Sequence, residues 1–141
     1  MSSRSTDWLI RLESNTDVDE VRDIVRDTFP TAGEATLVDT LRQVSPESFS
    51  LVAMLDGHVI GHIMFSPVTF EPSWSGVTAF GLAPLAVSKA HRKLGIGAAL
   101  VREGLAACAE RAAQLVVVLG DPPYYHRFGF ETARTFGLLN E

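Results

Sequence analysis

Apolar and polar positions recur along the chain with two different periods, and these divide its first part into a strand followed by two helices. Residues 8–14 (WLIRLES) alternate closely enough to predict a strand. Residues 15–29 carry apolar side chains at near-helical spacing, and Thr16 and Asp17 are candidate caps for the start of that helix. Residues 34–44 (EATLVDTLRQV) predict a second, shorter helix.

The middle of the chain is rich in β-branched and other apolar residues and predicts further strands. Residues 48–55 and 58–70 are separated by the dipeptide Asp56-Gly57, which is the strongest short signal for a hairpin. A loop containing proline, serine and glycine follows, and residues 77–87 then predict another strand. We therefore expect a hairpin and a further strand before the next helix.

The last part of the chain predicts a β-α-β crossover. A helix is expected over 95–113, where one i, i+4 row holds Ile96, Leu100, Gly104, Cys108 and Ala112. The small residues of that row suit close packing against a sheet. The apolar run 115–119 predicts a buried strand, parallel to the 77–87 strand because a helical crossover joins them. Residues 121–128 predict a short turn or helix, and GFETA from residue 129 begins a final strand.

The predicted element order is β-α-α-β-β-β-α-β-α-β, which is a mixed α+β layer structure. At 141 residues the chain is expected to form one domain, residues 1–141. Its single cysteine, Cys108, excludes an internal disulfide framework and most cysteine-based metal sites. We expect no metal and a cytoplasmic protein.

Charge and hydropathy narrow the classes of partner. No apolar run reaches the roughly 18 residues that span a bilayer, so no membrane association is expected. The net charge of −5 argues against a general nucleic-acid binder. On this acidic background a basic cluster stands out directly after the 77–87 strand: Lys89, His91, Arg92 and Lys93.

Gly95 and Gly97 follow the basic cluster and open the predicted 95–113 helix. A helix N-terminus offers unpaired N–H groups and the positive end of the helix dipole, and glycines let an anion come close to the backbone. The stretch therefore predicts an anion site, beyond the carboxyl end of a strand in the crossover. The alternative is that the glycines only form a tight turn and the basic side chains are solvated.

Two familiar phosphate loops do not match this stretch. A Walker A loop requires Lys and Ser or Thr after its second glycine, but Ala98 and Ala99 follow Gly97. A dinucleotide fingerprint requires a third glycine where Leu100 stands. The pattern present is Arg92-x-x-Gly95-x-Gly97-Ala98, which is a different loop.

The segment LAVSKAHRKLGIGAAL resembles the acetyl-coenzyme A loop of the GCN5-related N-acetyltransferases (GNAT), whose pattern is Arg/Gln-x-x-Gly-x-Gly/Ala at a strand-to-helix junction. Downstream, VVVLGDPPYYHRFGFE is similar to the Tyr-x-x-x-Gly-Phe segment of that superfamily. The sequence of these two segments most resembles the bacterial subgroup of YhbS-like predicted N-acetyltransferases, and the predicted element order also matches the family fold.

The resemblance implies a GNAT-like mixed central sheet with helices on both faces, splayed around an acetyl-CoA site. It implies an acyltransferase that moves the acetyl group of acetyl-CoA, its co-substrate, to a small-molecule or peptide amine by direct attack in a ternary complex. The cofactor-binding residues that it implies are Leu85, Ala86, Val87, Arg92, Lys93, Leu94, Gly95, Ile96, Gly97 and Ala98. A backbone N–H of residues 85–87 would polarise the thioester, and Tyr125, four residues before Gly129, would be the catalytic acid.

Pro84 interrupts the 77–87 strand and cannot donate a hydrogen bond to a sheet ladder. It predicts a bulged strand, which in this family leaves backbone groups free for the cofactor; the alternative is a bulge with no ligand. The general base is left open among Glu71, His62, Asp121 and an ordered water.

Two features depart from the family pattern. Asp121-Pro122-Pro123 stands where many members have a cofactor-contacting asparagine. The chain also stops at Glu141, so the closing strand is expected to be missing, incomplete or supplied by a partner in a homodimer. The rival functions are a non-catalytic acyl-CoA-binding or regulatory module on the same fold, and a protein that binds another nucleotide.

Overall fold

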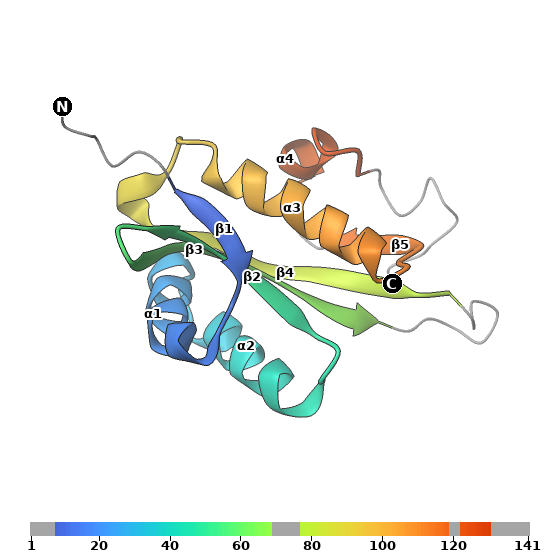
Figure 1. Cartoon of the computed structure of the whole chain (residues 1–141), viewed down its shortest axis with the longest axis horizontal. Helices are drawn as coiled ribbons and strands as arrows, with labels where there is room; N and C mark the ends of the chain where they lie inside the picture. The colour runs from blue at the N-terminus through green and yellow to red at the C-terminus, as the bar shows by residue number, and fades with distance from the viewer. Residues whose placement is uncertain (1–7, 69–76, 119–121, 131–141) are drawn as a thin grey trace.

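The computed structural model describes residues 8–68, 77–118 and 122–130 (Figure 1). Its elements are β1 (Leu9–Leu12), the 3-10 turn η1 (Asn15–Asp17), α1 (Val18–Thr28), α2 (Gly33–Val44), β2 (Phe49–Leu55), β3 (His58–Val68), β4 (Ala79–Val87), the 3-10 turn η3 (Lys89–His91), α3 (Ile96–Glu110), β5 (Leu115–Val118) and α4 (Pro122–His126). The strands form one mixed sheet in the order β1-β2-β3-β4-β5. Figure 1 shows α1 and α2 on one face of the sheet and α3 on the other.

The predicted fold class, an α+β structure with helices on both faces of a mixed sheet, is confirmed. The pairs β1–β2, β2–β3 and β3–β4 are antiparallel, and β4 pairs with β5 in parallel, as the crossover predicted. The Asp56-Gly57 hairpin is also present. Both turn residues have positive φ, 53° and 81°, which a two-residue type I′ turn requires.

The α1 side of the sheet is packed by the apolar stripe of α1. Val21 and Val25 lie on that stripe and are 0% and 1% exposed. They belong to one buried cluster with Ala86 of β4. At the start of the helix the carboxylate of Asp17 accepts hydrogen bonds from the Ser14 N–H at 2.7 Å and from the Arg11 guanidinium. The apolar stripe places α1 against β4, and the Asp17 contacts tie the start of the helix to Arg11 of β1.

The α3 side is packed through the predicted i, i+4 row. Ile96, Leu100, Gly104 and Cys108 are buried. A Cβ at Gly104 would lie 2.3 Å from Cε1 of Phe65 on β3, so the phenylalanine ring occupies the space that a glycine leaves. Small residues on this row therefore let α3 approach the sheet, as the sequence predicted.

The last two predictions about elements differ in part from the structure. The helix predicted over 95–113 ends at Glu110, and Ala112, expected on its buried row, is exposed with a φ of 65°. A positive φ cannot continue a right-handed helix. The final strand was expected from residue 129, but Gly129 and Phe130 are not in a strand, and the rest of that segment lies outside the described residues.

Strand β4 carries a bulge at Pro84. Its pairing with β3 passes from Ile63–Leu85 to Phe65–Leu82, so two steps along β3 correspond to three along β4. The extra residue lies in the stretch that contains Pro84, whose missing N–H disfavours a regular ladder. The bulge that the sequence predicted is therefore present.

Among the helices of the described residues, none combines the length and the apolar character that crossing a bilayer requires.

Candidate functional site

A cavity of about 660 Å³ lies where β4, the β4–α3 loop and α4 meet. The described residues that line it are Thr28, Leu85, Val87, His91, Arg92, Lys93, Gly95, Ile96, Gly97, Ala98, Tyr124 and Arg127. Eight of the ten residues predicted to bind the cofactor are in this set. Leu94 is not a lining residue and is 55% exposed, and Ala86 is 1% exposed among the side chains that face α1.

The β4–α3 loop leads into the N-terminus of α3, here called its mouth, through two residues with left-handed backbone conformations. Lys93 has a φ of 67° and Gly95 a φ of 86°. The helix begins directly afterwards at Ile96, and the Ala99 N–H donates to the Gly95 carbonyl at 3.0 Å. The N–H groups that come before this first bond have no partner within a helix. In α3 they are the N–H groups of residues 96–98, which line the cavity.

Alternate residues of β4 beside the cavity direct their backbone groups away from β3. The Ser88 N–H donates to the Ile60 carbonyl at 2.8 Å, and successive residues of a strand direct their backbone groups to opposite sides. With the observed register, Ala86 therefore faces β3, while Leu85 and Val87 face the other way. The ladder with β5 ends at Leu82, so the described part of β5 does not reach beside them.

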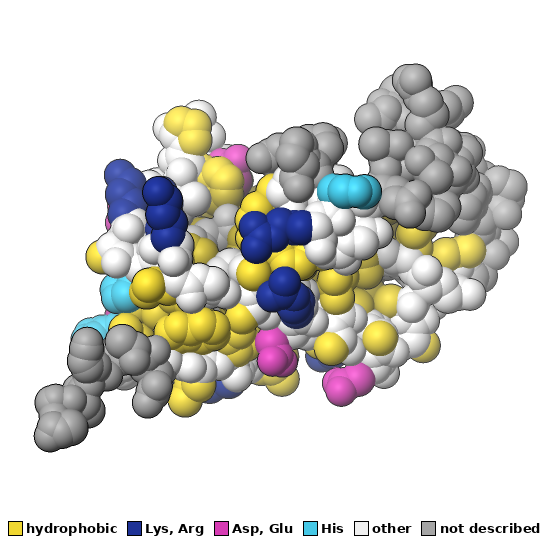
Figure 2. Space-filling model, turned by 90° about the horizontal axis from the view of Figure 1, so that it is seen from above, with side chains coloured by type: hydrophobic (Ala, Val, Ile, Leu, Met, Phe, Trp, Pro, Cys, Tyr) yellow, Lys and Arg dark blue, Asp and Glu magenta, His cyan; other side chains and the backbone are white. Residues whose placement is uncertain are grey.

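The charge of the cavity wall is positive. The lining residues include Arg92, Lys93 and Arg127, and no aspartate or glutamate is among the described ones. Arg92 is anchored, since its Nε donates to the Val87 carbonyl at 3.1 Å. Figure 2 shows Lys and Arg side chains in separate groups on the face that carries α3 and α4. In a chain of net charge −5, a wall of this kind favours a ligand with several negative charges.

Helix α4 contributes an aromatic wall and places Tyr124 in it. A Cβ added at Gly97 would lie 3.0 Å from the Tyr124 Oη, so the hydroxyl is close to the first turn of α3. Burial raises the pKa of Tyr124, and the nearby Arg127 and Arg102 oppose the rise by smaller amounts. The phenol is therefore protonated and able to donate a hydrogen bond at neutral pH.

Tyr125, the predicted catalytic acid, is not among the lining residues. Its ring makes edge-to-face contacts with Tyr124 at 5.0 Å and with Phe130 at 5.7 Å, and it packs against the core on the α3 side. The motif spacing selected Tyr125, whereas the rotation of α4 presents Tyr124 to the cavity. The catalytic role of Tyr125 stays a prediction.

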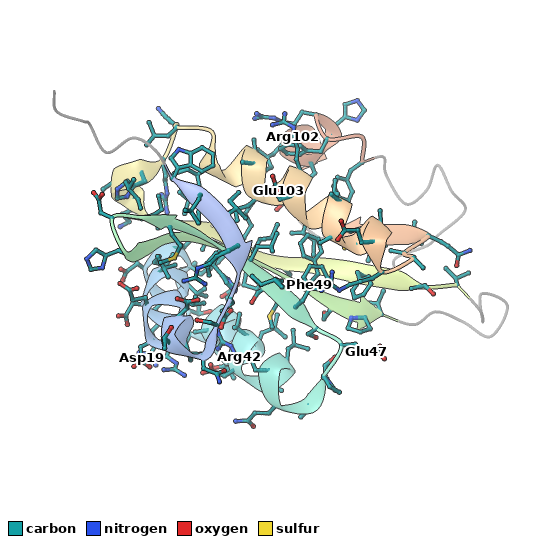
Figure 3. The ribbon with its side chains drawn as sticks, in the orientation of Figure 1. Asp19, Arg42, Glu47, Phe49, Arg102 and Glu103 are labelled. Atoms are coloured by element: carbon teal, nitrogen blue, oxygen red, sulfur yellow. The ribbon has the colours of Figure 1, made fainter. Side chains whose placement is uncertain are left out.

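His62, one of the candidate bases, is buried away from the cavity. It is 0% exposed, and its Nε2 lies 3.4 Å from Oε1 of Glu13. Burial lowers the pKa of His62 more than Glu13 raises it, so the imidazole is neutral. Arg42 of α2, labelled in Figure 3 on the α1–α2 side, pairs with the same glutamate at 2.6 Å. This geometry suits a structural polar cluster better than a base.

Glu71 and Asp121, the other two candidate bases, lie outside the described residues. Four of the described lining residues were not predicted from the sequence to bind the cofactor: Thr28, His91, Tyr124 and Arg127. His91 was noted only as a member of the basic cluster. Thr28 comes from the end of α1 and had no local signal. Arg127 had one, a basic residue within the tyrosine segment, but only the fold shows that it reaches the cavity. In the described residues, no group of three or more His, Cys, Asp or Glu side chains could hold a metal ion.

Comparison with known proteins adds independent information. Residues 18–130 match the model of the Acetyltransferase (GNAT) family. The uncharacterized N-acetyltransferase YhbS of Escherichia coli (strain K12) is 41% identical over 126 residues, which cover 89% of this chain and 74% of that protein.

Two crystal structures are similar in fold as well as in sequence. The Escherichia coli GNAT family N-acetyltransferase YhbS in complex with CoA matches with a TM-score of 0.87 and 38% identity, over 96% of this chain and 74% of that one. A GNAT family acetyltransferase from Brucella melitensis in complex with acetyl-CoA matches with a TM-score of 0.80 and 38% identity, over 89% and 84%. The chain belongs to the GNAT family of acetyltransferases.

Proposed function

We propose that this protein transfers the acetyl group of acetyl-CoA to a primary amine, by direct attack of the amine in a ternary complex. The observation that carries the proposal is the cavity at the mouth of α3, which has basic side chains and no carboxylate among its described lining residues. It lies beside Leu85 and Val87, whose backbone groups face away from β3 and lie beyond the end of the ladder with β5. A phosphate-bearing thioester needs both features.

The diphosphate of the cofactor suits the β4–α3 loop. The glycine mouth of α3 combines unpaired N–H groups with the positive end of the helix dipole, and the basic side chains of Arg92 and Lys93 stand beside it. Gly97 leaves the approach open, since a side chain there would extend toward Tyr124 and Val87. The relatives crystallised with CoA and acetyl-CoA support this choice of anion.

The exposed backbone of β4 suits the pantetheine arm. An extended arm with amide groups can add to a strand whose hydrogen-bonding groups face away from the neighbouring strand. The N–H groups of Leu85 and Val87 face away from β3 in this way, whereas the Val87 carbonyl accepts from Arg92. Acetyl-CoA supplies the activated acyl group. A Leu85 or Val87 N–H directed at the thioester oxygen would stabilise the charge that develops there, which is worth roughly 3–4 kcal/mol for one preorganised donor.

Two steps of the reaction require proton transfer. The departing thiolate needs a donor, and we assign this role to Tyr125 on its match to the family motif, with Tyr124 as the cavity wall beside it. A phenol pKa of about 10 lies above a thiol pKa of about 8.5, so the donor acts mainly through its position. The amine must be neutral before it attacks, and the burial of His62 favours an ordered water over that side chain as its base.

The test is turnover by the full chain. The protein is incubated with acetyl-CoA and a panel of amines that includes polyamines, amino sugars and lysine peptides. Free thiol is measured over time, and the acetylated product is identified by mass. Amine-dependent thiol release supports the proposal.

Two results would overturn the proposal in different ways. CoA binding without thiol release with any amine would indicate an acyl-CoA-binding module. Failure of CoA to protect against heat, together with protection by ATP or NAD, would indicate a different nucleotide ligand.

A further inference from the structure

Arg127 brings a positive charge to the cavity from the α4 side, separate in sequence from the β4–α3 loop that is proposed to bind the diphosphate. It lies directly after α4, and its guanidinium stacks over the rings of Tyr124 at 5.2 Å and Phe128 at 5.1 Å. Stacking of this kind orients a guanidinium and leaves its N–H groups free to bind an anion in its plane. The structure therefore holds Arg127 at the cavity by contacts that do not neutralise it.

The cavity has two separate sources of positive charge. One is the β4–α3 loop, where Arg92 and Lys93 lie at the mouth of α3, and the other is Arg127 on the α4 side. CoA likewise carries two separate anionic groups, the diphosphate and the 3′-phosphate of its ribose. A phosphomonoester holds about −1.5 to −2 charges at pH 7, so it needs cationic contacts of its own.

The two sources suit the two groups differently. The mouth of α3 can take the diphosphate, because backbone amides reach an anion only at close range. Arg127 is an exposed side chain at the rim, where a flexible terminal phosphate can be held. An arginine fork also matches the oxygens of a phosphate in a bidentate way.

We propose that Arg127 binds the 3′-phosphate of CoA and makes the site selective for CoA over 3′-dephospho-CoA. This inference rests on the proposed function, since it assumes that the cavity holds CoA. It adds a specificity determinant directly after α4 to a loop that recognises only the part common to both molecules.

Arg102 provides a matched control. Its guanidinium lies over the ring of Phe128 at 5.2 Å, almost the distance at which Arg127 stacks on the same ring. Figure 3 shows Arg102 beside α4, but it does not line the cavity. Loss of either arginine removes one positive charge and a contact with the Phe128 ring, and loss of Arg127 also removes the contact with Tyr124. Only the loss of Arg127 removes a charge from the cavity lining.

The experiment measures the dissociation constants of CoA and 3′-dephospho-CoA by titration calorimetry for the full-length wild type, Arg127→Gln, Arg127→Lys and Arg102→Gln. We expect the wild type to prefer CoA, and Arg127→Gln to lose about 10- to 100-fold in CoA affinity with little change for 3′-dephospho-CoA. Arg127→Lys should restore part of the preference, and Arg102→Gln should keep all of it. Melting temperatures without ligand verify that each variant is folded.

Three results would overturn the inference while CoA binding itself stands: an equal loss of affinity for both ligands in Arg127→Gln, no loss for either ligand in that variant, or the same loss of preference in Arg102→Gln. A wild type that binds neither ligand would instead refute the proposed function from which the inference starts.

Discussion

Replacement of Gly97 by leucine gives a direct test of the cavity at the mouth of α3. A Cβ at this position would lie 3.0 Å from the Tyr124 Oη and 3.7 Å from Cγ2 of Val87. The second distance is an ordinary contact, and the hydroxyl is the end of a side chain that can move by a few tenths of an ångström. The first atom of a new side chain therefore fits, and the rest of a leucine must extend into the cavity.

The expected loss follows from the hydrogen bonds that this side chain would block. A hydrogen bond from a backbone N–H to a charged group contributes about 1.5–3 kcal/mol. Obstruction of two such donors costs at least about 3 kcal/mol, which is roughly a 150-fold loss of CoA affinity. The fold should be kept, because leucine has a higher helix propensity than glycine by up to about 1 kcal/mol.

The assay pairs calorimetric titration of CoA with the melting temperature in the absence of ligand, for Gly97→Leu, Gly97→Ala and Gly33→Ala. Alanine at 97 should weaken binding less than leucine. Gly33 lies at the start of α2, and among the described residues a Cβ there would meet the Thr31 hydroxyl alone, at 3.4 Å, so this control should leave binding unchanged. Wild-type CoA affinity in a folded Gly97→Leu protein would refute the assignment of the cavity.

Three further predictions concern the reaction, the packing and the response to acid. Tyr125→Phe should lower kcat at least tenfold with CoA affinity nearly intact; an unchanged kcat in steady-state kinetics would remove this hydroxyl from the mechanism, and Tyr124→Phe run in parallel tests whether the cavity-lining hydroxyl takes its place. Gly104→Ala should cost about 1–3 kcal/mol of unfolding free energy in urea, because the new methyl would lie 2.3 Å from the ring of Phe65, which is 0% exposed; a neutral result would show that α3 can shift away from the sheet. Hydrogen bonds from Arg11 lower the pKa of Asp17 from 3.8 to about 2, so the stability that this group adds is present above pH 3.8 and is lost as the pH falls toward 2. In Asp17→Asn, the fall in unfolding free energy between those pH values should be smaller than in the wild type by about 1–2 kcal/mol, a figure reduced for solvent screening of the half-exposed Arg11. An unchanged dependence of unfolding free energy on pH would contradict this prediction.

Local patterns in the sequence predicted most of the elements and located the candidate site. The hydrophobic periods located the strands and helices, and the Asp56-Gly57 dipeptide located the hairpin. Pro84 marked the bulge in β4, and the glycines at 95 and 97 marked the mouth of α3. Each of these signals acts over a few residues, through backbone dihedral angles, missing hydrogen-bond donors or the period of a helix or strand, so a single sequence carries it.

Tertiary structure decided which side chains reach the cavity. Tyr124 and Tyr125 are adjacent and chemically equal, and only the packing of α4 on α3 places the first in the wall. The same packing brings in Arg127, while the burial of His62 beneath the α1–α2 side removes a candidate base. The rotation of a helix about its axis and the depth of a strand residue depend on contacts between segments far apart in the chain, and no local pattern records them.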